Sequence, residues 1–186
     1  MGSRSTSLFA LISILAAAGA ASGVAAQAQT GPAPATPHEI PQSQVIEHQE
    51  NLERLTALAG RPGQVGAIAR RAITIYKEHN ARETEYILPP LVLLPYIVDG
   101  KVTPDMDWAL AMTDRVRTDR EVIFEEHARV IEVLNELQFA GQQEHDAEAV
   151  DYARGAATDA LNDVEILEPT VIMIGDVLHA KLTPGR

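Results

Sequence analysis

From Pro41 onward, apolar residues recur every three to four positions, and this periodicity constrains the fold more than any other feature of the sequence. The pattern divides into segments of about 43–59, 64–94, 104–141 and 144–181, and none alternates polar and apolar residues over a useful length. In the last segment the apolar stripe is predicted to contain Tyr152, Ala156, Ile166, Met173 and Val177. Long amphipathic helices with short links predict an all-α, antiparallel up-down four-helix bundle.

The two halves of this helical region resemble each other. A single shift of the chain along itself aligns Glu47 with Glu126 and His48 with His127. A shift longer by one position aligns four further pairs: His79/Asp159, Glu83/Asp163, Glu85/Glu165 and Pro89/Pro169. Two helix pairs that agree at nearly the same offset predict a pseudo-two-fold internal repeat.

The composition excludes several classes of protein. The chain has 15 Lys and Arg residues against 26 Asp and Glu, a formal net charge of −11, so it would repel the phosphates of a nucleic acid partner. It contains no cysteine, which excludes disulfides, Cys-ligated zinc, iron–sulfur clusters and thiol catalysis. A metal in this protein must therefore be held by His and carboxylate side chains.

The N-terminal region has the features of a secretory signal. Arg4 is followed by an apolar run over residues 8–18 and by the small-x-small sequence Ala26-Gln27-Ala28. The run is short for a permanent membrane span, which is the weaker alternative. We therefore predict a signal peptide over residues 1–28, a periplasmic location, a flexible leader over 29–42, the bundle over 43–181 and a C-terminal tail over 182–186.

Six residues with metal-binding side chains interrupt the apolar stripes: His48, His79, Glu83, His127, Asp159 and Asp163. Residues four apart project from one helix face, so His79/Glu83 and Asp159/Asp163 could each chelate an ion. A buried carboxylate is unfavourable unless it is paired or bound to a cation, so the pattern predicts a metal centre on the bundle axis. In the alternative interpretation the histidines are ordinary hydrogen-bonded core residues and the two aspartates are exposed. The other histidines, His38, His145 and His179, are predicted to be solvated.

Prolines lie inside two otherwise helical runs, at Pro89-Pro90 and at Pro169. Proline lacks a backbone donor and clashes with the preceding turn. The sequence therefore predicts a kink or break at both places, with simple helix termination as the alternative at Pro89-Pro90.

These residues together resemble the hemerythrin-like, or HHE cation-binding, family. The resemblance rests on His48, on His79 and Glu83 followed by EYILPP, on His127 within EEHARVIEVL, and on the later EILEP. It implies a four-helix bundle with a non-haem, usually di-iron, centre that binds oxygen or responds to oxidants and nitric oxide, with His48, His79, Glu83 and His127 as matched ligands.

The last helix departs from this family pattern. The family has a His where this chain has Asp159 and a carboxylate where it has Asp163, and Ile131 stands where a second helix-three His would be. Fewer nitrogen ligands favour hard cations, iron or manganese, and argue against reversible oxygen carriage.

The sequence therefore favours an exported protein with a mono- or dinuclear iron centre, active in metal storage or in the response to O2 or another small oxidant. A metal-free interaction or stress protein with a vestigial site is the first alternative, and a di-metal oxidase or peroxidase is the second. No nucleophile–base constellation or phosphate-binding loop indicates another enzymatic activity, and the oligomeric state does not follow from the sequence.

Overall fold

The computed structural model describes residues 38–183, and all regular structure in this range is helical. Helices contain 88% of these residues and none of them forms a β-strand, which confirms the all-α prediction. Within the same range, no helix is long and apolar enough to cross a membrane. The predicted signal peptide, residues 29–37 of the predicted leader and residues 184–186 of the predicted tail lie outside the described residues.

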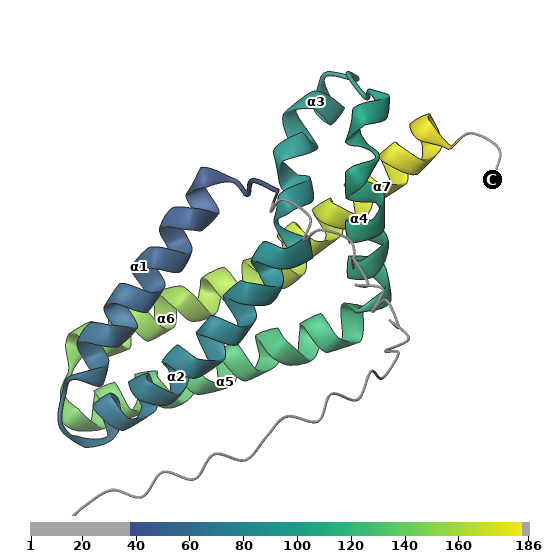
Figure 1. The fold of residues 1–186 in the computed structure, drawn as a ribbon. Helices are drawn as coiled ribbons and strands as arrows, with labels where there is room; N and C mark the ends of the chain where they lie inside the picture. Colours follow the sequence, from purple (N-terminus) through teal and green to yellow (C-terminus); the bar gives the residue numbers. More distant parts are fainter. Residues whose placement is uncertain (1–37, 184–186) are drawn as a thin grey trace, which may run out of the picture. The chain divides into compact units, whose positions relative to one another are not determined.

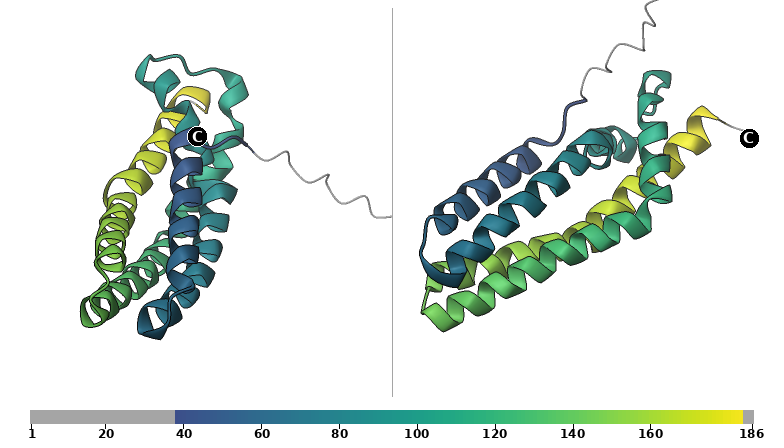
Figure 2. Two further views of the ribbon diagram at one scale, coloured as in Figure 1. Left: turned by 90° about the vertical axis from the view of Figure 1, so that its left-hand side faces the viewer. Right: turned by 60° about the horizontal axis from the view of Figure 1, so that its bottom comes forward.

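Four of the helices lie side by side: α1 (Gln42–Ala59), α2 (Gly63–Arg82), α5 (Arg120–Glu144) and α6 (Ala147–Asn162) (Figures 1 and 2). α1 packs against α2, α2 against α5, α5 against α6, and α6 against α1. Three residues link α1 to α2 and two link α5 to α6, so the helices of each pair run in opposite directions. Their shared core is apolar and fully buried, and includes Leu55, Leu58, Val65, Leu134 and Leu137.

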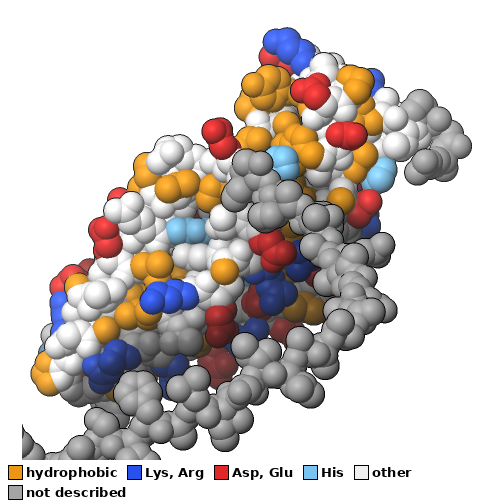
Figure 3. Space-filling view, viewed as in Figure 1, with side chains coloured by type: hydrophobic (Ala, Val, Ile, Leu, Met, Phe, Trp, Pro, Cys, Tyr) orange, Lys and Arg blue, Asp and Glu red, His pale blue; other side chains and the backbone are white. Residues whose placement is uncertain are grey.

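The remaining helices form a second packed region. α4 (Trp108–Thr118) packs on α7 (Glu168–Leu182), and the short helix α3 (Leu94–Val98) and the 3-10 segments η2 (Pro89–Leu93) and η3 (Pro104–Met106) lie against them. The core of this region consists of Leu93, Met106, Ala109, Ile174 and Leu178. On the face drawn in Figure 3, hydrophobic side chains gather at this end, where Tyr96 and Val98 of α3 are exposed.

Close approach of α4 and α7 depends on a glycine. A Cβ atom on Gly175 would lie 2.5 Å from Oγ1 of Thr113, and Thr113 is itself buried. The two backbones therefore meet at a distance that only glycine permits at this position.

The predicted third segment is two helices rather than one. α4 ends at Thr118 and α5 begins at Arg120, because Asp119 leaves the helical conformation with φ −90° and ψ 9°. The Asp119 carboxylate accepts a hydrogen bond from the Tyr86 hydroxyl at 3.1 Å. The break allows α4 to pack on α7 while α5 packs on α2 and α6.

Each proline-containing run includes a π-helical turn, η1 (Glu83–Ile87) in the first and η4 (Asp163–Leu167) in the second. These turns begin at Glu83 and Asp163, which form one of the pairs matched between the two halves of the sequence. The last amide before each proline donates to a carbonyl five residues back, Leu88 to Glu83 and Glu168 to Asp163. A widened turn relieves the clash that proline makes with the carbonyl four residues before it. The helical path then breaks at Leu88, whereas at Pro169 it continues directly into α7.

Candidate metal centre

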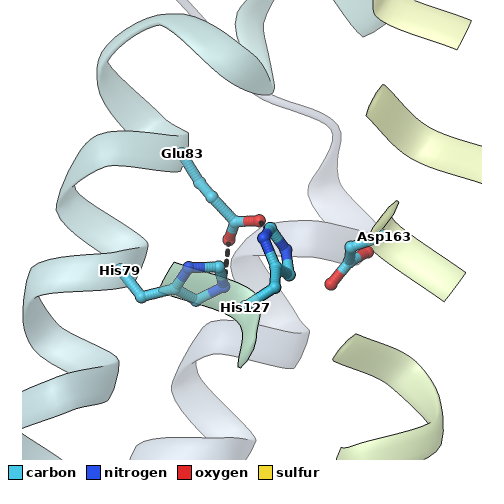
Figure 4. A group of neighbouring side chains, drawn as sticks. All are labelled: His79, Glu83, His127 and Asp163. Atoms are coloured by element: carbon cyan, nitrogen blue, oxygen red, sulfur yellow. Dashed lines mark ion pairs between the residues drawn. The ribbon is translucent and has the colours of Figure 1, made fainter. Parts of the chain in front are cut away.

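Four side chains converge between the helices: His79 of α2, Glu83 of η1, His127 of α5 and Asp163 of η4 (Figure 4). Each offers one ligand atom, and these atoms all lie within 4.8 Å of one another. Two ligand atoms on opposite sides of one ion are about 4.2 Å apart when the metal–ligand bonds are about 2.1 Å long. Small side-chain adjustments would therefore place all four atoms on a single cation.

The two carboxylates stand where an α-helix changes to a π-helical turn. Glu83 and Asp163 are the first residues of η1 and η4. Single π turns inside α-helices are frequent at functional sites, where the extra residue changes which side chains face inward. The amides of Glu83 and Asp163 donate to the carbonyls of His79 and Asp159, four residues back, so α-helical spacing places both carboxylates and each π turn shifts only the residues that follow.

His127 has a defined tautomer. Its Nδ1 atom lies 3.0 Å from the carbonyl oxygen of Ile123. A carbonyl oxygen only accepts, so Nδ1 carries a proton, and in the neutral ring Nε2 then presents a lone pair. This Nε2 is buried and has no hydrogen-bond partner among the described residues. The arrangement is that of a metal-ligating histidine oriented through its other nitrogen.

Glu83 is the central acceptor of the group. Its Oε2 atom lies 2.9 Å from Nε2 of His48 and 3.4 Å from Nε2 of His79, and its Oε1 atom lies 3.9 Å from Nε2 of His127. Burial alone would raise the pKa of Glu83, but the hydrogen bond from His48 and the neighbouring imidazoles lower this pKa below its ordinary value. Glu83 is thus an ionised, buried carboxylate surrounded by histidines.

His79 and Asp163 favour their uncharged forms. Burial lowers the pKa of His79 to about 4. Burial, together with the nearby charges of Glu83, Glu47 and Asp159, raises the pKa of Asp163 to about 8. At neutral pH the protein without a cation therefore has neutral His79 and protonated Asp163, and a cation would compete with that proton.

The structure thus brings together four of the six predicted ligands. His48 is partly buried and contacts the group through its hydrogen bond to Glu83. Asp159 is exposed and is not a member of the group.

Of the three histidines predicted to be solvated, His38 is not free in solvent, because its ring stacks on Trp108 with the centroids 3.9 Å apart. His145 is exposed and ends α5 in the left-handed conformation. His179 is partly exposed and lies 2.8 Å from the Asp114 carboxylate.

No protein-family model, curated protein or solved structure matches this chain. The resemblance to hemerythrin-like proteins therefore depends only on the residues quoted above. The chemistry of the site has to follow from its own side chains.

Glu168 is a site residue that the sequence did not reveal. It is buried, and its Oε1 atom lies 3.6 Å from Nδ1 of His127. Glu168 follows Asp163 by five residues, the repeat of a π turn, whereas a search at the spacing of three or four used for α-helices misses it. A glutamate directly before Pro169, five residues after a candidate ligand, is the signal that could have identified it.

Proposed function

We propose that the protein binds a non-haem metal ion, iron, through His79, Glu83, His127 and Asp163. The observation that carries this proposal is the buried, unpartnered Nε2 of His127 beside two carboxylates. A buried nitrogen without a hydrogen bond costs about 1–3 kcal/mol. A cation would satisfy this nitrogen and neutralise the carboxylates at the same time.

The donor set supports iron, with manganese as the alternative. Two imidazole nitrogens and two carboxylate oxygens are ligands that both metals accept in proteins, and the absence of cysteine leaves no soft ligand. The group described here holds one ion. A second ion would need Glu47 and Asp159 as ligands. The two lie close enough beside the group that, after burial, the charge of Asp159 raises the pKa of Glu47.

We further propose that the fold is a hemerythrin-like four-helix bundle with a pseudo-two-fold repeat. The ring of contacts among α1, α2, α5 and α6 supports the bundle. The two π turns that begin at the matched residues Glu83 and Asp163, each followed by a proline, support the repeat.

An exported metal protein of this kind is suited to iron storage or to the response to O2 or another small oxidant. Export is supported by the signal-like residues 1–28. N-terminal sequencing of protein from the periplasmic fraction should give a mature chain that begins near Gln29. Recovery of the uncut chain from the inner membrane would contradict export.

Metal content is the decisive test of function. The protein should be produced in medium supplemented with iron and manganese, and its metals should be quantified by elemental analysis. We expect about one iron per chain, loss of this iron in Glu83→Ala, and normal content in the control His179→Ala, which alters a histidine on α7 outside the group. If the wild-type protein contains no metal and its melting temperature is unchanged by added iron or chelator, the site is vestigial. Turnover of peroxide by the iron-loaded protein would indicate an oxidase or peroxidase.

A further inference from the structure

A groove of about 540 Å³ lies between α5 and the end of α6 with η4. This volume lies within the range of about 300–1,000 Å³ typical of small-molecule sites. Most of its lining is apolar, and comes from Phe124, Ala128, Ile131, Leu161 and Val164. Phe124 is 59% exposed, although so large an apolar side chain is normally covered. An exposed concave apolar surface of this kind indicates a ligand site.

The charged side chains of the groove are all acidic. Glu136 forms an ion pair with Arg71, but Glu132 and Glu165 form none with any side chain in residues 38–183. No Lys or Arg of the described region lines the groove. The groove's own charged side chains are therefore negative, which favours a positively charged ligand and disfavours an anion.

His127 also lines the groove and connects it to the metal centre. Its side chain is buried, and its unpartnered Nε2 belongs to the four-residue group. On the opposite wall, Val164 and Glu165 follow Asp163 directly in η4. A ligand in the groove would therefore lie beside the four-residue group. The statement that this neighbour holds a metal rests on the proposed function, whereas the groove itself does not.

We propose that the groove binds a small organic cation, an amine with an aromatic or aliphatic body. The body would contact Ile131 and Leu161, and the ammonium group would lie near Glu132 and Glu165. The exposed ring of Phe124 can contribute a cation–π contact. A second copy of the chain fits less well, because it would bring its own net charge of −11 against these glutamates.

Three indoles that differ in charge test this proposal by isothermal titration calorimetry on the mature protein. Tryptamine is a cation, tryptophol is neutral and indole-3-propionate is an anion. We expect tryptamine to bind at least about tenfold more tightly than indole-3-propionate at low salt, with a smaller difference at high salt. Tryptophol should bind with intermediate affinity.

Substitutions locate the site. Glu132→Gln combined with Glu165→Gln should remove the preference for tryptamine. The matched control, Glu50→Gln combined with Glu53→Gln, removes two exposed charges from α1 and should preserve the preference. Ala128→Phe, at an exposed position of the groove, should fill it and weaken the binding of all three indoles, while circular dichroism shows an unchanged helix content.

Several results would overturn the proposal. They are equal affinity for the three indoles, equal effects of the groove and control variants, or unchanged binding in Ala128→Phe. A dimer that must dissociate before tryptamine binds would show that a second copy covers the groove. Metal content is measured on the same samples, so a protein that binds tryptamine but no metal refutes the proposed function and leaves the groove site intact.

Discussion

Nε2 of His48 on α1 lies 2.9 Å from Oε2 of Glu83, so the imidazole of His48 is directed at a carboxylate of the four-residue group. A donor in this position orients the carboxylate and keeps it ionised. The contact thus indicates that His48 positions Glu83 and is not itself a ligand.

The first prediction tests whether His48 positions Glu83 or binds the metal itself. Glu83 loses its orienting donor in His48→Ala, so we expect iron affinity to fall by about 10–100-fold with the stoichiometry retained. His48→Gln, whose amide can still donate, should lose less. Competition titrations against a chelator would measure both affinities. Loss of stoichiometric binding in His48→Ala, as expected for His79→Ala, would make His48 a ligand.

The second prediction concerns the pH dependence of the metal-free protein. Asp163 has a pKa raised from 3.8 to about 8, so the folded state favours its protonated form. Its contribution to the free energy of unfolding is complete below pH 3.8 and is lost as the pH rises through about 8. Asp163→Asn should therefore melt higher than the wild type at pH 8.5 by at least about 2–4 °C, the shift that about 1 kcal/mol produces in a domain of this size.

The same comparison at pH 4 serves as the control. There the carboxyl of Asp163 is protonated in the folded state and partly protonated in the unfolded state, so the melting temperatures of the two proteins should be similar. The pKa of His79 is lowered to about 4, so its contribution to the free energy of unfolding changes in the opposite direction and is lost as the pH falls from 6.5. Because both proteins contain His79, that loss cancels. A difference independent of pH would contradict the assignment to Asp163.

The third prediction is proton release on metal binding. At pH 6.5 the carboxyl of Asp163 is protonated in the metal-free protein, and a cation must displace that proton to bind the carboxylate. Calorimetry in buffers with different ionisation enthalpies should show release of about one proton per metal from this group. The release should fall by about one proton in Asp163→Asn. A binding enthalpy independent of the buffer would show that the metal displaces no proton from Asp163.

The fourth prediction uses two helical glycines. Gly175→Ala places a Cβ atom 2.5 Å from Oγ1 of buried Thr113, so α7 must shift away from α4. Forced packing of this kind costs about 1–3 kcal/mol. Gly155→Ala in α6 meets no atom within 4 Å and should add about 0.5–1 kcal/mol through helix propensity. Urea unfolding of both variants would measure the two effects, and equal effects would contradict the close approach at Gly175.

The sequence predicted the helical class and four members of the group, because both depend on local periodicity. It did not predict the break at Asp119, because the contacts of Asp119 with Tyr86 and of α4 with α7 are distant in sequence. One apolar stripe cannot show that its two halves pack on different partners.

The last predicted helix shows a second limit. Ile166 and Met173 were expected in its buried stripe, but Ile166 is 62% exposed and Met173 is 49% exposed. Tyr152 and Ala156 are buried as predicted, but the rest of the buried face consists of Ala153 and Ala160 in α6 and of Val171, Ile174 and Leu178 in α7. The π turn between them adds a residue to the helical register, so a stripe drawn with α-helical spacing leaves the buried face. Small residues also give a weak hydrophobic signal where helices approach closely.

The position of the group between two hydrophobic cores has a consequence for folding cooperativity. His79 and Glu83 lie between Tyr76, in the core of α1, α2, α5 and α6, and Tyr86, which belongs to a second buried cluster with Ile87, Val116, Ile123 and Val171. Each π turn replaces α-helical hydrogen bonds by i→i+5 bonds at this level, whereas α5 runs unbroken from Ile123 in the second cluster to Val130 in the first core. A bound ion with ligands on η1, α5 and η4 would make both cores open as one unit. Amide hydrogens of α4 and α7 would then exchange only through global unfolding, and removal of the metal would allow them to exchange on their own.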